Sequence, residues 1–504
     1  MLSPLSITFI LVIYFAVLIF ISQITSRNNS NESFFIGQRK SPWYIVAYGM
    51  IGASLSGVTF LSVPGMVEKG EFFYMEMVLG FVPGYLFIAY VLMPIYYKMN
   101  VYSIYGYLKK RFGYYAHKCG AGYFFLSRLL GASLRLYLVA IVLQELLFEP
   151  IGVPFFITTL ITIFLIWLYT YRGGIKTIIW TDTLQTSFML LTVIVCLIVL
   201  FQQLGYSSIS DSISQNNLDL RIFTVSDFNN SNHFFRSFFA GMFIAIAMTG
   251  LDQDMMQKNL SCNNIKEAQK NMIVFSIILV FVNMLFLYLG ALLYDYAALN
   301  DISPERPDEL FTDVVNSGKL GLLVFVLFLL GLISAAYSSA DSALTSLTTS
   351  FCVDFLGVKK HKNQSEFFST RTLVHISISL LLCCVILLVN HYITDRSIID
   401  KLFEWAGYTY GPLLGLFTFG IFTSRVIRDK YVPLIVILSP VLSYIIAKYH
   451  LFFSFIDSYN GDILNSFMCR MLESDFYFGH DLIIVNGFIT FMLLFFVSRK
   501  KSIV

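Results

Sequence analysis

The sequence predicts an all-α polytopic membrane protein, and three observations support this fold class. The 504 residues are 57% hydrophobic and only 13% charged. Their mean hydropathy is +0.72 and they include 50 phenylalanines, so too few polar residues remain to cover a water-soluble globule. Apolar stretches long enough to cross a bilayer recur from one end to the other. We therefore expect one membrane domain and no appended soluble domain.

Thirteen apolar stretches are long enough to be membrane-spanning helices. We expect them at residues 4–24, 44–66, 72–97, 119–148, 151–171, 177–203, 235–256, 271–296, 318–352, 371–391, 400–423, 431–450 and 480–498. The first has no basic segment before it and no small-residue cleavage site after it, which indicates a retained helix rather than a signal peptide. Residues 202–232 are rich in Ser, Asn and Asp, so we expect an external loop there.

The basic residues are distributed unevenly between the loops. With the N-terminus outside, about two thirds of the 34 Lys and Arg residues fall in loops expected on the cytoplasmic side. These loops include residues 109–111 and the segment after the seventh span that contains Lys258, Lys266 and Lys270. The positive-inside rule thus predicts an external N-terminus and a cytoplasmic C-terminus in a cell membrane.

A polar stripe interrupts the ninth apolar stretch. Small and hydroxyl residues recur there at spacings of three and four, which places them on one helix face: Ala335, Ser338, Ser339, Ser342, Thr345, Ser346 and Thr349. Asp341 lies beside this stripe. Because a carboxylate in hydrocarbon is costly, Asp341 is expected to face a cavity, a partner or an ion such as a small cation. The alternative is that the small residues only allow two helices to pack closely.

Two spans carry helix-breaking residues at membrane depth. They are residues 52–65, which contain glycines, hydroxyls and a proline, and the GLDQD segment at 250–254. Backbone that unwinds there must line a cavity or be buried in protein. The two breaks lie five spans apart, which indicates two inverted five-helix repeats with a binding site where the breaks meet. The alternative is two ordinary packing helices that contain glycine.

This pattern divides the single transporter-like domain into four parts. We expect a leading helix at 4–24, a first repeat at 44–203, a second repeat at 235–423 and two trailing helices at 431–498.

Charged residues inside the apolar stretches are further candidates. Asp182 and Gln185 fall in the first turns of the sixth span, where an acid either compensates the helix dipole or faces the polar stripe. Arg128 and Arg135 are seven residues apart on one face of the fourth span. At that depth an arginine requires a carboxylate partner, a water-filled cavity or an anionic substrate, unless it snorkels to the surface. Glu76 is one possible partner.

Several function classes find no support in the sequence. It contains no nucleophile elbow, phosphate-binding glycine loop or histidine metal motif, so we do not expect an enzyme. It also lacks a basic and aromatic surface for nucleic acid. The seven cysteines are scattered without metal-ligand spacing, and they indicate neither a zinc site nor a disulfide framework.

Five segments, in order, resemble the motifs of the sodium:solute symporter family. They are ESFFIGQR at 32–39, VYSIYGYLKKRFG at 101–113, GGIKTIIWTDTLQ at 173–185, GLDQDMMQ at 250–257 and GYTYGPLLGLF at 407–417. The third is the most specific, and the resemblance extends over residues 5–450. It implies a LeuT-type fold of five plus five inverted helices, with one helix before and two after, and the thirteen expected spans fit that plan.

The resemblance also implies which residues bind sodium. In this family one Na+ lies between the first broken helix and the hydroxyl helix. The matching ligands here are the carbonyls of Gly52, Leu55 and Ala335 and the hydroxyls of Ser338 and Ser339.

Some members of the family bind a second Na+ on the same helix. The matching residues are Asp182, Ser338 and Ser342, and Asp341 replaces a hydroxyl of better-known members. That replacement either adds charge to the second site or makes it respond to protons. The expected cofactor is therefore Na+, one or two ions, co-transported.

The resemblance places the solute at the breaks, facing Ser56, Thr59 and Tyr74. Arg135 favours an organic anion, such as a monocarboxylate or an acidic sugar, over a neutral sugar or amino acid, because a guanidinium binds a carboxylate in bidentate fashion. We expect a symporter that imports a small polar solute by alternating access as a monomer. The alternatives are a non-transporting sensor or receptor, a passive channel and an intramembrane enzyme.

Overall fold

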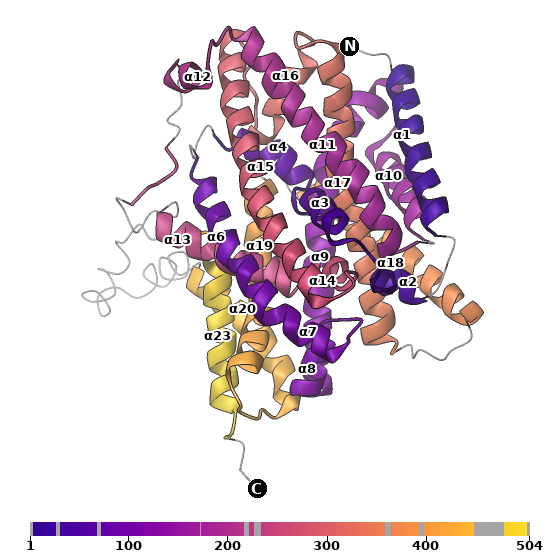
Figure 1. Ribbon diagram of the computed structural model, residues 1–504, viewed down its shortest axis with the longest axis vertical. Coiled ribbons are helices and arrows are strands. Elements are labelled where there is room, and N and C mark those ends of the chain that lie inside the picture. The colour runs from indigo at the N-terminus through magenta and orange to yellow at the C-terminus, as the bar shows by residue number, and fades with distance from the viewer. Residues whose placement is uncertain are drawn as a thin grey trace, which may run out of the picture.

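The computed structural model describes residues 4–26, 31–67, 72–171, 173–215, 221–225, 233–357, 364–392, 398–447 and 478–500. Within these residues the chain forms helices, and the β-structure is limited to two isolated bridges. The predicted all-α fold class is confirmed. Figure 1 shows the helices as one elongated bundle.

The helices follow one another along the whole described chain. In order they are α1 (Pro4–Thr25), α2 (Asn31–Ile36), α3 (Trp43–Ser54), α4 (Gly57–Gly65), α6 (Tyr74–Phe87), α7 (Met93–Met99), α8 (Gly106–Arg111), α9 (Tyr114–Leu143), α10 (Phe155–Thr170), α11 (Ile175–Gln203), α12 (Ile209–Gln215), α13 (Phe234–Ala245), α14 (Gln253–Leu260), α15 (Ile265–Leu299), α16 (Leu310–Asn316), α17 (Leu322–Ser350), α18 (Gln364–Tyr392), α19 (Ile398–Phe422), α20 (Val432–Ala447) and α23 (Leu482–Val497). Short π-helical segments extend four of them: η2 (Ile88–Leu92), η3 (Gln144–Phe148), η5 (Ile246–Gly250) and η7 (Phe351–Phe355).

Each predicted span overlaps at least one of these helices. By length and composition, eight helices of the described chain can cross a membrane, or up to ten spans if each of two bent pairs counts as one. The apolar helices α10 and α23 are shorter. The protein is thus a multi-pass membrane protein, and the count of thirteen stays a prediction. The end of the predicted span 431–450 lies outside the described residues.

The expected external loop at 202–232 is wrong in one place, because α12 forms inside it. Its polar residues stabilise the start of this helix: Ser208 Oγ accepts from the Asp211 N–H at 3.1 Å, and Asp211 accepts from the Ser207 N–H at 3.0 Å. Short polar side chains that would favour a loop therefore act here as a helix cap. Residues 216–220 and 226–232 of the segment lie outside the described chain.

Both predicted helix breaks are present. The axes of α3 and α4 differ by 57°, and the backbone leaves the helix at Leu55 (φ −83°, ψ 80°) and at Ser56, which is extended. The axis of α13 with η5 differs from that of α14 by 65°. At this second break, Asp252 is extended and caps α14 by accepting from the N–H groups of Asp254 and Met255.

Helix α17 is the central element of the bundle. Every residue from 331 to 350 is buried, and α17 packs on α11, α9, α3 and α4 (Figure 1). Thr192 of α11 donates to the Leu327 carbonyl at 2.6 Å, and a Cβ at Gly331 would lie 2.4 Å from Thr192 Oγ1. Small residues thus allow α11 and α17 to approach closely.

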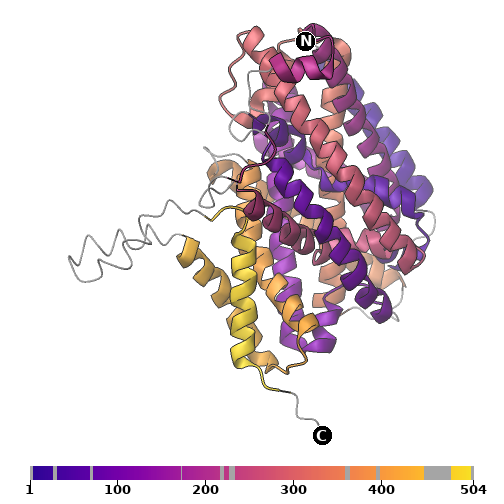
Figure 2. The ribbon, with the colours of Figure 1, turned by 60° about the vertical axis from the view of Figure 1, so that its left-hand side comes forward.

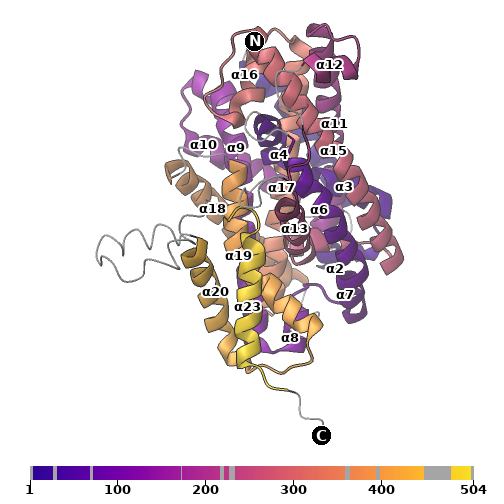
Figure 3. The ribbon, with the colours of Figure 1, turned by 90° about the vertical axis from the view of Figure 1, so that its left-hand side faces the viewer.

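The last helices form a flank of their own. Helices α19, α20 and α23 pack together on one side of the bundle (Figure 3). Figure 2 shows α23, in yellow, at the edge of the bundle and away from the indigo N-terminal helices. The first described residues of α1 and the last residues of α23 lie at opposite ends of the long axis (Figure 1).

Candidate solute and ion sites

A cavity of about 80 Å³ lies at the first helix break. Its walls come from the end of α3 and from α4, α6, α9, α13 with η5, α14, α15 and α19. The four residues predicted to face the solute all line it: Ser56, Thr59, Tyr74 and Arg135. The structure thus brings together residues that are up to 79 positions apart in the sequence. A ligand pocket typically has at least roughly 300 Å³, so this cavity is narrower than a usual ligand pocket in the present conformation.

Arg135 is a buried cationic residue in the wall of the central cavity. Its side chain is buried, with 8% of the residue exposed, and it borders both the central cavity and a smaller one beside Tyr410. Within the described chain, no hydrogen bond or ion pair engages its guanidinium, and Nε is buried without a partner. Glu76 instead accepts from the Thr224 N–H at 2.8 Å, so the suggested pairing of Glu76 with Arg135 is wrong.

Arg128, about two helical turns before Arg135 on α9, has a different environment. It pairs with Asp254 on α14 and lies 3.9 Å from Asp252 Oδ2. Tyr410 on α19 donates to the same Asp252 oxygen at 2.5 Å. Arg128 is only 4% exposed, so the proposal that it snorkels to the surface is wrong. These contacts join α9, α14 and α19 at the second break.

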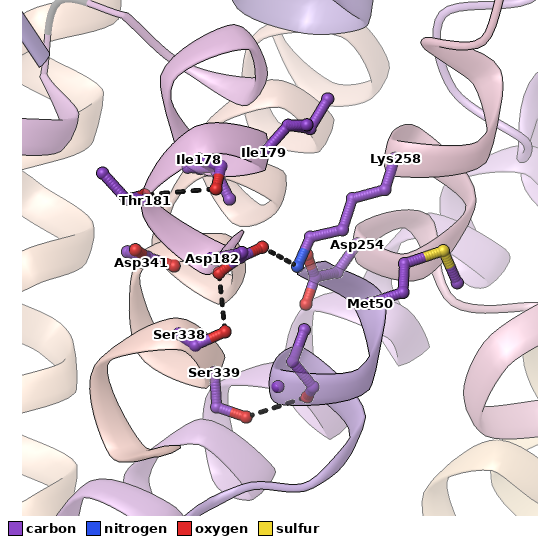
Figure 4. Close-up of polar contacts among 12 residues, drawn as sticks. Met50, Ile178, Ile179, Thr181, Asp182, Asp254, Lys258, Ser338, Ser339 and Asp341 are labelled. Atoms are coloured by element: carbon purple, nitrogen blue, oxygen red, sulfur yellow. Dashed lines mark hydrogen bonds and ion pairs between the residues drawn. The ribbon is translucent and has the colours of Figure 1, made fainter. Parts of the chain in front are cut away.

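The first break meets the hydroxyl stripe of α17. Ser339 Oγ donates to the carbonyl of Ala53 at 3.2 Å (Figure 4). The last carbonyls of α3, from Gly52 onward, lose their intrahelical partners at the break and become available to other donors or to a cation. Two segments with candidate sodium ligands therefore lie side by side: Gly52 and Leu55 at the end of α3, and Ala335, Ser338 and Ser339 on α17.

An acidic cluster lies farther along the same stripe. Ser338 Oγ donates to Asp182 Oδ1 at 2.6 Å, and Lys258 Nζ donates to Asp182 Oδ2 at 2.7 Å (Figure 4). Asp341 interacts electrostatically with both Asp182 and Lys258, and Tyr169 donates to its Oδ2 at 3.0 Å. Asp182 and Asp341 are 0% exposed and Lys258 is 1% exposed. The cluster is therefore fully removed from water.

Lys258 is a residue of this candidate site that the sequence analysis missed. Its assignment to a cytoplasmic loop is wrong, because α14 carries it into the bundle after the second break. A signal was available: Lys258 follows the GLDQDMMQ motif directly and lies one turn after Asp254 on the same helix face. Its partner Asp182 is 76 residues away, and no local pattern connects the two.

A further cavity, of about 350 Å³, lies at the C-terminal end of α9. Acidic side chains dominate its walls: Glu145, Glu305, Asp308, Glu309 and Asp313, with Arg306 among them. Arg306 pairs with Glu309. Burial and the neighbouring Glu309 and Glu305 carboxylates raise the pKa of Asp313. The sequence analysis did not anticipate this acidic chamber.

A membrane bundle with two broken helices, a polar cavity at the break and a hydroxyl helix beside it defines a secondary transporter. The family model of the sodium:solute symporter family matches residues 34–429, and the chain belongs to this family. It is a sodium-coupled transporter and not an enzyme, and Na+ is the co-transported ion.

Individual relatives agree with this placement. The chain is 25% identical over 419 residues to the sodium/sialic acid symporter NanT of Aliivibrio fischeri, covering 79% of each protein. It is 24% identical over 410 residues to the human sodium/iodide cotransporter, covering 78% of this chain but only 61% of that protein's length.

Solved structures show the same fold. A substrate-bound, outward-open Na+-coupled sialic acid symporter superposes with a TM-score of 0.80 at 18% identity, covering 98% of this chain and 99% of that one. Mhp1, a nucleobase-cation-symport-1 family transporter in a closed conformation, superposes with a TM-score of 0.53 at 14% identity, covering 93% and 94%. The predicted LeuT-type architecture is confirmed.

Proposed function

We propose that this symporter imports an organic anion together with Na+, and that the anion is a monocarboxylate or an acidic sugar. One observation carries the proposal: the buried guanidinium of Arg135 borders the central cavity and has no partner within the described chain. An unpaired buried charge is costly, so a bound anion that pairs with it stabilises the complex. The relatives that transport sialic acid and iodide also carry anions.

The cavity offers the other contacts that an acidic sugar requires. Ser56 and Thr59 supply hydroxyls from α4, and Tyr74 supplies a hydroxyl and an aromatic face from α6. Arg135 can bind a carboxylate with two parallel N–H groups. Because the cavity is smaller than such a solute, loading requires the walls to move, and the breaks at Leu55 and at Leu251 are natural hinges for that movement.

The first sodium site of this proposal uses the junction of α3 and α17. Its ligands are the carbonyls of Gly52, Leu55 and Ala335 and the hydroxyls of Ser338 and Ser339. All are oxygens, as a hard cation requires, and none carries a formal charge. A site built from neutral oxygens binds Na+ weakly enough to release it inside the cell. Ser56, which follows the proposed ligand Leu55, lines the solute cavity. The ion site and the solute cavity therefore meet at the same helix break.

A second sodium belongs at the acidic cluster, where Asp341 lies next to Asp182 and Lys258 (Figure 4) and Ser342 follows Asp341 on α17. The acidic chamber at the end of α9, which faces outside in the orientation proposed below, supports cation uptake, since a mainly acidic chamber concentrates cations. We further propose a cell-membrane protein with an external N-terminus and a cytoplasmic C-terminus. We propose that it acts as a monomer, because one chain supplies every proposed contact, and that it binds no nucleic acid.

Uptake into proteoliposomes tests the function. Purified protein is supplied with an inward Na+ gradient or with K+ in its place, and the labelled solutes are sialic acid, lactate, iodide, glucose and alanine. We expect uptake of an organic acid that requires Na+ and no uptake of the neutral solutes. Sodium-dependent uptake of glucose or alanine alone would establish the neutral-solute alternative. Solute binding without uptake would establish the sensor.

The Arg135→Lys variant tests the residue that carries the proposal. Lysine keeps the charge but loses the bidentate fork, so we expect the apparent solute affinity to fall at least about tenfold while Na+ binding persists. Arg306→Lys is the matched control, because Arg306 lies in the outer chamber and is paired with Glu309. Unchanged solute affinity in a folded Arg135→Lys protein would refute the anion role.

A further inference from the structure

The acidic cluster on α17 carries an unequal number of charges. Two carboxylates, Asp182 and Asp341, face one ammonium, Lys258, and all three are buried. With each group ionised, the cluster has a net charge of −1. A net charge held away from water is strongly unfavourable, and one further monovalent cation would neutralise it.

The two carboxylates differ in how completely they are engaged. Asp182 uses both oxygens: Oδ2 accepts from Lys258 and Oδ1 accepts from Ser338 (Figure 4). Asp341 Oδ2 accepts from Tyr169 and the Ser342 backbone N–H also interacts with this carboxylate, but Oδ1 is buried and accepts no hydrogen bond from another side chain. The carboxylate oxygen that is available to bind a cation is therefore Asp341 Oδ1.

Two neighbouring hydroxyls share this condition. Ser342 Oγ and Thr345 Oγ1 are buried and unpartnered, and both follow Asp341 within one turn of α17. Thr345 lies four residues after Asp341, on the same helix face. By contrast, Ser346 and Thr349 on this helix donate to the carbonyls of Ala343 and Thr345. Unpartnered oxygens thus occur at Asp341, at the adjacent Ser342 and one turn later at Thr345.

We propose that Asp341, with Ser342, holds the second sodium ion, and that Lys258 is the permanent counter-ion of Asp182. The inference rests on the sodium-coupled function proposed above. It differs from the set implied by family resemblance, in which Asp182 is the charged ligand. Lys258 neutralises Asp182, so no metal cation is needed there. Asp341, which stands where better-known members have a hydroxyl, binds the Na+ instead. The protein then binds two Na+ at neighbouring positions of α17, one at Ser338 and Ser339 and one at Asp341 and Ser342.

Equilibrium binding of ²²Na+ to the purified, detergent-solubilised full chain counts these ions without knowledge of the solute. We expect two ions per wild-type chain and one per Asp341→Asn chain. The Asp182→Asn/Lys258→Gln double variant removes a neutral pair, and we expect it to retain two ions. Size-exclusion chromatography checks that each variant is folded. If Asp341→Asn fails this check, Ser342→Ala replaces it, with an expected weakening of one of the two ions by about tenfold.

Three results would overturn the inference: one ion per wild-type chain, two ions in folded Asp341→Asn, or one ion in the folded double variant. The last result would return the site to Asp182. Failure of the proposed function looks different, because wild-type uptake would then ignore the Na+ gradient whatever the ion count. A count of one with sodium-driven uptake intact overturns only the assignment of Asp341.

Discussion

At the scale of single residues, Ser338 joins the first proposed ion site to the Asp182–Lys258 pair. Its hydroxyl proton points to Asp182 Oδ1, which leaves its lone pairs for an ion at the first site. Ser339, the next residue, donates to the Ala53 carbonyl at the end of α3. Both hydroxyls therefore connect α17 to a neighbouring element and have an ordered orientation before any ion arrives.

Replacing either serine by alanine should weaken Na+ binding. A desolvated ion that loses one oxygen ligand has no equally placed water to replace it, and we expect the Na+ half-saturation of uptake to rise about tenfold for Ser338→Ala or Ser339→Ala. Ser346→Ala is the matched control, since Ser346 donates to Ala343 within its own helix. The first-site assignment fails if both variants keep the wild-type half-saturation.

The residue scale also shows what the sequence could and could not predict. Helical spacing was sufficient to place Ser338 and Ser339 on one buried face, because that pattern is local. The resemblance supplied Ser56, Thr59 and Tyr74, which line one cavity. The ammonium at Asp182 was not predictable, because a pair 76 residues apart depends on how α11 and α14 pack.

At the scale of helices, glycines set how closely neighbouring elements approach. Helices α6 and α13 are in extensive contact. A Cβ at Gly80 would lie 2.0 Å from the carbonyl oxygen of Phe238, and one at Gly241 would lie 2.0 Å from that of Met77. The two backbones are thus in direct contact. Gly241 lies within the predicted span 235–256, but no pattern in the sequence indicates which helix it contacts.

An alanine at Gly241 should therefore destabilise the fold. The added methyl meets backbone that cannot move independently, and overpacking of this kind costs about 1–3 kcal/mol or more. Gly122→Ala on α9 is the control, because no atom lies within 4 Å of its added Cβ and alanine favours a helix by about 1 kcal/mol. Thermal unfolding in detergent measures both. An unaltered midpoint for Gly241→Ala would contradict the packing described here.

Helix breaks were predictable at this scale because their causes are local. Glycines, hydroxyls and a proline between 52 and 65 weaken the helix, and the bend of 57° follows. The spans were predictable for the same reason, since apolar length is a property of the segment. Buried ion pairs between helices, such as Arg128 with Asp254, were not predictable, because they join helices that are distant in the sequence.

At the scale of the whole molecule, ion count and solute charge together decide how the membrane potential acts. Two Na+ moved with one monovalent anion carry a net charge of +1, whereas one Na+ with the same anion carries none. Moving one charge through 100 mV is worth about 2.3 kcal/mol, which corresponds to roughly fifty-fold accumulation. A neutral solute with two Na+ would gain roughly the square of that factor.

Proteoliposomes with equal Na+ on both sides separate these cases. A valinomycin-clamped potassium gradient sets an interior potential of −100 mV, and the steady-state ratio of internal to external solute is measured. For a monovalent organic acid we expect roughly fifty-fold accumulation, and none at zero potential. Asp341→Asn should abolish the effect, because transport with a single Na+ is electroneutral. Accumulation that ignores the potential in the wild-type protein would mean that one Na+ accompanies each anion, and Asp341 would then have no ion to hold.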